Sequence, residues 1–183
     1  MKPIRELSMR LALAPILAGF LACPSTLKAV SIPDSPEITK LLADVKGEAA
    51  ELKSDAEDLN TFANSNLSWA SHASKIELMK THINNSGKLL AQMQDSEALG
   101  SPWQQTAIRR IEPVLRELAE NTERTIHYLN ENQMKIHFGE FKDYVKANYE
   151  LATDLETLIR DFVAYGEAKQ KLEKLGEKLE ITG

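Results

Sequence analysis

The sequence predicts an all-α protein, namely an antiparallel up-down four-helix bundle with coiled-coil-like packing and a long C-terminal helix. Three observations predict this fold class. Apolar residues recur at alternating steps of three and four over long stretches, which is the spacing of one helix face. Gly and Pro are sparse, with 8 and 7 among 183 residues. No stretch shows the strict apolar–polar alternation that is typical of a half-buried strand.

The first 29 residues have the composition of a secretory signal peptide. Lys2, Arg5 and Arg10 precede the mostly apolar run LALAPILAGFLAC, and Ala29 is the expected last residue before cleavage. The run has thirteen residues, too few to span the apolar core of a bilayer. We therefore expect the protein to be exported to the bacterial periplasm or beyond, with no transmembrane segment after the signal is removed.

Cys23 offers an alternative to a freely exported protein. The stretch GFLAC resembles, loosely, the motif that precedes a lipidated cysteine, so a lipid anchor at Cys23 is the alternative localisation. Cys23 is the only cysteine of the chain. If cleavage follows Ala29, the mature protein has no disulfide framework and no thiol chemistry.

A single helical domain is predicted over residues 37–183, after a short polar leader at 30–36. Ser35 followed by Pro36 is typical of a helix start, so the first helix is expected over about 37–64. Its apolar residues follow a heptad pattern without a miss: Ile38, Leu42, Val45, Ala49, Leu52, Ala56, Leu59 and Ala63.

Two further helices are predicted over about 67–95 and 102–134. The inward face of the first contains Trp69, His72, Ile76, Met79, Ile83, Ser86, Leu90 and Met93. The second begins with Ser101 and Pro102, and Gln104 completes a capping box. Its inward face contains Ile108, Ile111, Leu115, Leu118, Thr122, Thr125 and Leu129. Pro113 removes one backbone hydrogen bond, so we expect a kink or a split near residues 109–112.

The fourth helix is predicted over about 140–180, after an interruption between residues 130 and 139. Its heptad row consists of Tyr144, Leu151, Leu158, Tyr165, Leu172 and Leu179, and the stripe is widened by Val145, Leu155, Ile159 and Phe162. This helix is longer than its neighbours, so residues 169–181 are expected to overhang the bundle or to fold back on its base. Leu172, Leu175 and Leu179 then form a candidate association surface, with a frayed tail as the alternative.

An up-down bundle also gathers aromatic and histidine side chains at one end. Phe62, Trp69, His72, His127, Tyr128, His137, Phe138, Phe141 and Tyr144 all fall where the first helix ends, the second starts, the third ends and the fourth starts. Large rings that close the end of a bundle would explain this gathering. A pocket for a small ligand or a partner-docking face is the functional interpretation. A dimer of two-stranded coiled coils is the alternative architecture, and it would disperse these residues.

Metal and haem sites are not indicated by the histidine spacing. His72 and His82 are ten residues apart, which on a helix separates them by about 15 Å. No Glu-x-x-His and no Cys-x-x-Cys-His motif occurs. We therefore assign no catalytic residue, no metal ligand and no cofactor.

The net charge of the chain disfavours one class of binding partner. The formal net charge is −5 and no basic stripe is present, which disfavours nucleic acid. The sequence thus predicts a non-enzymatic binding module of the bacterial cell envelope, with a second copy or an envelope protein as its partner. The alternative is a bundle that binds a small ligand or a metal at its aromatic and histidine end.

Overall fold

The computed structural model describes residues 32–65, 67–133 and 139–180. Four helices make up this part of the chain: α1 (Pro36–Ala63), α2 (Trp69–Asp95), α3 (Pro102–Glu131) and α4 (Gly139–Lys178), with a short 3-10 turn, η1 (Glu97–Leu99), between α2 and α3. The predicted signal peptide and residues 30 and 31 of the leader lie outside the described residues.

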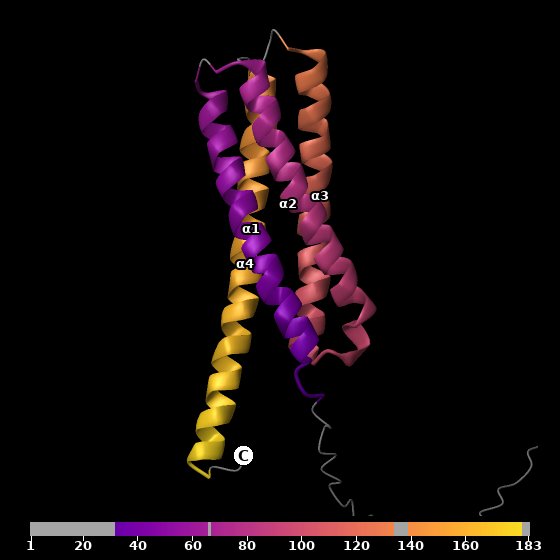
Figure 1. Ribbon diagram of the computed structural model, residues 1–183, viewed down its shortest axis with the longest axis vertical. Helices are drawn as coiled ribbons and strands as arrows, with labels where there is room; N and C mark the ends of the chain where they lie inside the picture. The colour runs from indigo at the N-terminus through magenta and orange to yellow at the C-terminus, as the bar shows by residue number, and fades with distance from the viewer. Residues whose placement is uncertain (1–31, 66, 134–138, 181–183) are drawn as a thin grey trace, which may run out of the picture. The chain divides into compact units, whose positions relative to one another are not determined.

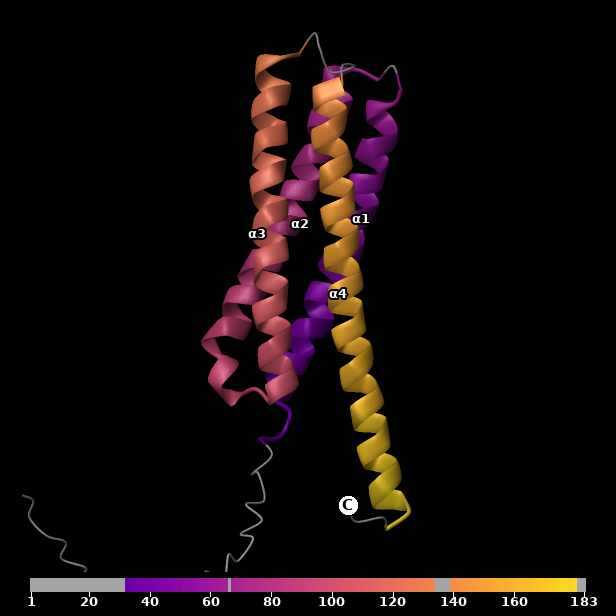
Figure 2. The ribbon, with the colours of Figure 1, turned by 180° about the vertical axis from the view of Figure 1, so that it is seen from behind.

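The helices form an antiparallel up-down bundle, so the predicted fold class is confirmed. α1 packs against α2 and α4, and α3 packs against the same two helices, which closes a ring of four (Figures 1 and 2). No strand occurs in the described part of the chain. The chain leaves the helical conformation at Asn132 and Gln133, which confirms the interruption expected between residues 130 and 139.

Local sequence signals determine where the helices begin. The Ser35 hydroxyl accepts a hydrogen bond from the Ile38 backbone at 3.4 Å, and the Ser68 hydroxyl accepts one from Ser71 at 3.3 Å. At the start of α3, Gln104 closes the predicted capping box by accepting a bond from the Ser101 backbone at 3.0 Å. Gln104 also accepts a bond from the Ser35 backbone at 2.8 Å, so the same amide joins the starts of α1 and α3.

The predicted inward faces of the first three helices form the core. All eight apolar residues expected on the inward face of α1 are buried. On α2, every expected position except the half-buried Trp69 is buried, including the polar His72 and Ser86. The expected inward residues of α3 are buried as well.

The inward face of α4 was predicted only in part, because Val145, Leu155 and Ile159 of the predicted stripe are buried whereas its heptad row is not. The residues that face the core are Phe141, Val145, Asn148, Ala152, Leu155 and Ile159. The heptad row that begins with Tyr144 lies on the flank of this face instead, half-buried as far as Leu158 and exposed from Tyr165 onward. The heptad pattern did not identify this face because two of its core positions are occupied by a polar residue, Asn148, and a small one, Ala152. A search for large apolar residues does not select them.

Asn148 is buried because α3 satisfies all of its hydrogen-bonding groups. Its side-chain carbonyl accepts bonds from Asn121 at 2.9 Å and from Thr122 at 3.1 Å, and its amide donates to Thr125 at 2.9 Å. Asn121 donates a further bond to the Tyr144 carbonyl at 2.9 Å. A buried network with every member paired fixes the register between two helices, because any sliding would leave polar groups unpaired.

Pro113 does not split α3, which runs without interruption from Pro102 to Glu131. Pro113 and Arg109 both lie on the exposed side of the helix. The carbonyl of Arg109, which would otherwise accept the bond that proline cannot donate, can therefore bond to water. The expected split is thus wrong because the proline falls on the solvent side.

α4 continues past the other helices at one end of the bundle, which is the overhang expected for residues 169–181, of which 181 lies outside the described residues (Figures 1 and 2). Lys169 bonds to Asp34, two residues before α1, at 2.7 Å. That contact marks the level at which the bundle ends, and residues 170–180, here called the projecting segment, extend beyond it. Among the described residues, no helix combines the length and the apolar character that crossing a bilayer requires.

Candidate functional site

The aromatic end of the bundle is built around His72. This side chain is fully buried, and its Nδ1 lies 2.9 Å from the carbonyl of Ser68, the residue that caps the start of α2. The ring lies edge-on to Phe62 and Phe141, with centroid distances of 6.3 and 5.5 Å. Nε2 has no hydrogen-bond partner in the described part of the chain. His72 therefore presents one unpaired polar atom inside an aromatic cage.

Two more of the predicted aromatic residues, Tyr128 and Tyr144, join this cage, and Trp69 lies at the same end of the bundle. Tyr128 stacks on Phe141 at a centroid distance of 6.2 Å and lies 5.8 Å from Tyr144. Trp69 donates a hydrogen bond from Nε1 to the Leu129 carbonyl at 3.0 Å, which fastens the start of α2 to the end of α3. The structure thus brings together five residues of the predicted gathering: Phe62, His72, Tyr128, Phe141 and Tyr144.

His127, a second histidine of the predicted site, does not join His72. His127 is exposed, with 74% of its side chain accessible, and its Nε2 lies 3.5 Å from Glu131 on the same helix. His137 and Phe138 lie outside the described residues. The candidate ligand site at this end stays a prediction that rests on His72 and its ring neighbours.

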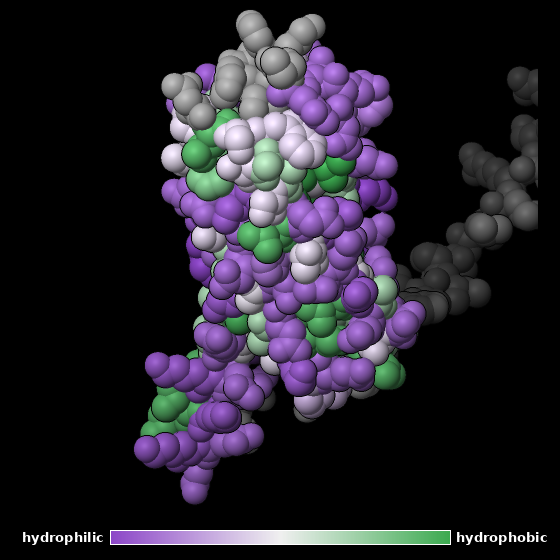
Figure 3. Space-filling model, turned by 45° about the horizontal axis from the view of Figure 1, so that its top comes forward, coloured by the Kyte–Doolittle hydropathy of each residue, from purple (hydrophilic) through white to green (hydrophobic). Residues whose placement is uncertain are grey.

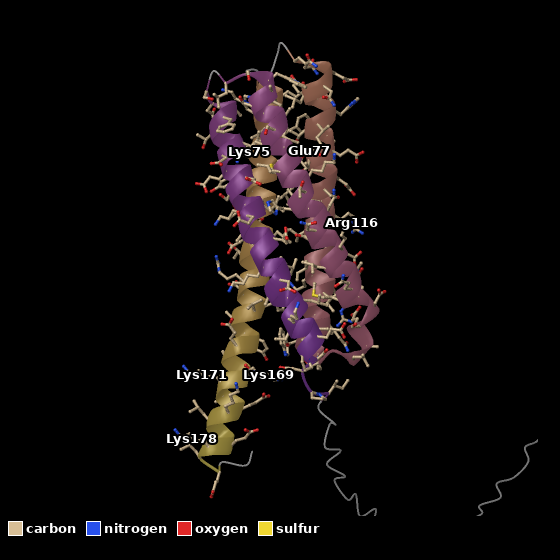
Figure 4. The ribbon with its side chains drawn as sticks, in the orientation of Figure 1. Lys75, Glu77, Arg116, Lys169, Lys171 and Lys178 are labelled. Carbon is tan, nitrogen blue, oxygen red and sulfur yellow. The ribbon has the colours of Figure 1, made fainter. Side chains whose placement is uncertain are left out.

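The described residues contain no group of three or more His, Cys, Asp or Glu side chains arranged to hold a metal ion. His82, ten residues after His72, is part of a contact between α1 and α2. Its Nδ1 lies 2.7 Å from Glu48 and its Nε2 lies 3.6 Å from Asp55. Lys75, labelled in Figure 4, joins the same two helices through Asp55 at 3.1 Å and Asp58 at 3.0 Å. The hydrogen bond that Lys75 donates to Asp58 raises the pKa of Lys75 and outweighs the loss of hydration, which lowers it.

A second candidate site lies at the opposite end, and the sequence did not predict it. Trp103, at the start of α3, donates a hydrogen bond from Nε1 to Asp34 at 2.8 Å, and its ring lies 5.5 Å from Tyr165. Lys169 bonds to the same Asp34 oxygen at 2.7 Å. Beside these groups a cleft of about 660 Å³ opens between the leader, α1 and α4, with Leu42, Ala43 and Val163 among its lining residues. The signal available in the sequence was only the isolated Trp103.

Charge pairing stabilises the polar edge of this cleft. Burial alone would raise the pKa of Asp34, but the hydrogen bonds that it accepts, first of all from Lys169, outweigh burial and lower it. The hydrogen bond to Asp34 in turn raises the pKa of Lys169 above its ordinary value. Both groups are therefore charged at neutral pH and hold the leader against α4.

The projecting segment of α4 presents the predicted association residues to solvent. Leu172, Leu175 and Leu179 are 71%, 45% and 61% exposed. Figure 3 shows hydrophobic side chains on the projecting end of α4 with hydrophilic ones on both sides. Large apolar side chains gathered on one helix face, beyond the bundle that could have buried them, are typical of an interaction surface.

Comparisons with known proteins do not identify the chain: no protein-family model, no curated protein and no solved structure matches it.

Proposed function

We propose that this protein is an exported, non-enzymatic interaction module of the bacterial cell envelope, and that it binds its partner through the projecting segment of α4. The observation that carries the proposal is the exposure of Leu172 and Leu175 on α4, where the helix has passed the bundle, and of Leu179 directly after the helix ends at Lys178. Burying a leucine side chain against a partner is worth about 1.5–3 kcal/mol. Three such residues supply the core of a small interface.

The ionisable groups of the described chain support a binding role. Asp34, Lys75 and Lys169 have shifted pKa values, and each of them bonds to a group on another part of the fold. Asp34 and Lys169 join the leader to α4, and Lys75 joins α2 to α1. Perturbed pKa values also occur at catalytic sites. Here the charged group that each of these three residues contacts on another part of the fold is a sufficient structural cause of the shift.

Export is supported by the composition of the N-terminal segment. Three basic residues precede a thirteen-residue apolar run, and small residues follow. A lipid anchor at Cys23 is the alternative within the same proposal. The mass of the N-terminal peptide of protein purified from the producing cells separates the two: a chain that begins after Ala29 is free, and a chain that begins at a lipidated Cys23 is anchored.

A second candidate function is binding of a small ligand or a metal at the aromatic end. The observation in its favour is the unpaired Nε2 of His72, since a buried acceptor without a partner is unusual in a folded protein. Elemental analysis and an optical spectrum of protein purified without a histidine tag test it. A metal or chromophore that is lost in His72→Leu supports ligand binding. If the purified protein contains neither a metal nor a chromophore, and no metal of a panel shifts its thermal midpoint, ligand binding at this end is contradicted.

Photo-crosslinking in the producing cells tests the interaction role. A photo-reactive side chain replaces Leu172 in the full chain, and the matched control places it at Leu78 of α2, an apolar residue that is 46% exposed on the bundle. We expect adducts from position 172 and none from position 78. If position 172 gives no adduct with any protein, including a second copy, the projecting segment is not an interaction surface.

A further inference from the structure

We propose that the cleft between the leader, α1 and α4 binds a small organic cation, namely an amine with a bulky apolar body. Val163, Gly166 and Gln170 line this cleft at steps of three and four along α4. Their face of α4 lies about 120–180° around the helix from Leu172. The cleft is therefore a different surface from the leucines of the projecting segment, and the inference does not depend on the interaction role.

The cleft has the size of a small-molecule site. Its volume of about 660 Å³ falls within the range of about 300–1,000 Å³ that ligand pockets occupy. The leader, α1, α4 and the start of α3 all contribute lining residues. The contribution of α3 is Trp103, which packs directly against the backbone of Gly166. Because tertiary contacts assemble the walls, a ligand would enter a site that is already formed.

Much of the lining is apolar. Leu42 and Ala43 of α1, Val163 of α4 and the ring of Trp103 all face the cleft, and the leader adds Ile32. Leu42 is buried, whereas Ile32 is 43% exposed. A bound apolar body would remove the exposed part of this lining from water, which is a main source of affinity in such a site.

The charged groups of the cleft are mostly acidic. Three carboxylates line it, those of Asp34, Glu167 and Glu173, and Lys169 supplies the one ammonium among the lining residues of the described chain. Lys169, labelled in Figure 4, lies 2.7 Å from Asp34 and 3.5 Å from Glu173, so its charge is already compensated. Glu167 has no ion-pair partner in the part of the chain that the structure describes. The cleft therefore has a net negative charge, which attracts a cation and repels an anion.

The same groups favour an organic cation over a metal ion. The Asp34 oxygen that lies nearest to Lys169 already accepts hydrogen bonds from Lys169 and from Trp103. A metal ion needs several oxygen or nitrogen ligands around one point, and an apolar lining supplies none of them. An amine needs one carboxylate for its charge, and its apolar body fits the remainder of the lining.

Two probes with the same apolar body and opposite charges test the inference: aminoadamantane, which is a cation at neutral pH, and adamantane carboxylate, which is an anion. The indole N–H signals of the two tryptophans in a two-dimensional NMR spectrum of nitrogen-labelled protein report binding. The N–H of Trp103 bonds to Asp34 at the edge of the cleft. The N–H of Trp69 bonds to the Leu129 carbonyl at the opposite end of the bundle, so its signal is an internal reference.

We expect aminoadamantane to shift the Trp103 signal in a saturable way, with a Kd of about 0.1–1 mM for a ligand of this size, and to leave the Trp69 signal unchanged. Adamantane carboxylate should bind at least about tenfold more weakly. If the amine gives no saturable shift up to about 10 mM, or if the carboxylate binds equally well, the inference is wrong.

Removal of the acidic groups tests the origin of the charge preference. The variant Glu167→Gln/Glu173→Gln is expected to bind the amine about tenfold more weakly. The matched control Glu140→Gln/Asp154→Asn removes the same charge from exposed positions of α4 that do not line the cleft, and it should change the affinity by less than about twofold. Equal losses in the two variants would show that the overall charge of the protein attracts the amine, which contradicts a specific site.

A larger side chain in the cleft tests the location of the ligand. Ala43 is exposed on α1 and lines the cleft, so Ala43→Phe fills the space without entering the core. Ala50→Phe, two turns further along α1, is exposed and does not line the cleft, which makes it the matched control. We expect Ala43→Phe to abolish amine binding and Ala50→Phe to retain it, with circular dichroism verifying that both variants are folded. Unchanged binding in Ala43→Phe would show that the amine binds elsewhere and would overturn the inference.

Discussion

The indole of Trp103 lies directly against the backbone of Gly166, so closely that a Cβ atom on Gly166 would come within 2.7 Å of the ring carbon Cη2. Glycine is therefore required at this position of α4 for packing, although it costs helix stability. The contact lets the start of α3 reach α4 and brings the indole N–H to Asp34. Trp103, Gly166 and Asp34 together determine how the cleft at this end is closed.

Gly166→Ala is expected to destabilise the protein by about 1–2 kcal/mol, the usual cost of overpacking, because Trp103 must move and gives up its bond to Asp34. Thermal unfolding measures the loss, and the emission of the two tryptophans reports the displaced indole. Gly47→Ala is the matched control, since a Cβ there meets nothing within 4 Å. It should stabilise α1 by about 0.5–1 kcal/mol. Equal effects of the two substitutions would show that Trp103 does not pack as described.

The ion pair between Asp34 and Lys169 is expected to make stability depend on pH in a defined direction. Because the pKa of Asp34 is lowered from its ordinary value of 3.8, its contribution is present above that value and is lost as the pH falls through the lowered pKa. Because the pKa of Lys169 is raised from 10.5, its contribution is present below that value and is lost as the pH rises through the raised pKa.

Asp34→Asn is therefore expected to cost about 1 kcal/mol at neutral pH and much less at a pH below the lowered pKa of Asp34, where the carboxyl group of the unsubstituted protein is itself protonated. Urea unfolding at both pH values measures the difference. Asp44→Asn is the control, because Asp44 pairs with Lys40 on the surface of α1, where an ion pair contributes little. An equal cost for Asp34→Asn at both pH values would contradict the pairing.

The spacing of apolar residues along the helices made the architecture predictable. Contacts between residues that are far apart in the sequence could not be predicted in this way. The inward face of α1 could be predicted because each of its core positions is apolar and recurs at steps of three and four. The inward face of α4 could be predicted only in part. Its apolar core residues Val145, Leu155 and Ile159 were expected. Asn148 was not, because it is buried only through its partners on α3. A polar residue in a core is indistinguishable from a surface residue until the groups that satisfy it are known.

The candidate sites were likewise predictable where they follow from the helix topology and not predictable where they depend on contacts between distant residues. The gathering of His72, Tyr128 and Phe141 follows from topology alone, because an up-down bundle brings those helix ends together. The outward orientation of His127 depends on the rotation of α3 about its axis. The cleft at the other end depends on Gly166 and Asp34, neither of which belongs to a recognisable motif.

Asn148→Ala is expected to destabilise the protein by about 3 kcal/mol. The substitution removes the partner of the Thr122 hydroxyl and one of the two partners of Asn121 and of Thr125, and all of these groups are buried. Denaturant unfolding measures the loss. The simultaneous substitution Asn121→Leu/Asn148→Leu removes polar groups from both helices and should recover part of it. A loss below about 0.5 kcal/mol for Asn148→Ala would mean that water satisfies the network instead.

Ser86→Ala is expected to stabilise the protein, in contrast to Asn148→Ala. The Ser86 hydroxyl is fully buried on α2 and has no hydrogen-bond partner among the described residues. Leaving a buried hydroxyl unpaired costs about 1–3 kcal/mol, whereas replacing it by hydrogen removes one atom from a helix position that suits alanine. The variant should therefore be more stable by about 1 kcal/mol, measured as a higher thermal midpoint. Thr125→Val is the matched control on α3, because it removes a hydroxyl that bonds to Asn121 and Asn148, and it should be destabilising. If both substitutions lower the midpoint, Ser86 has a bonding partner in solution, and a buried water beside α2 is the candidate, since such waters bond to buried polar groups that otherwise lack partners.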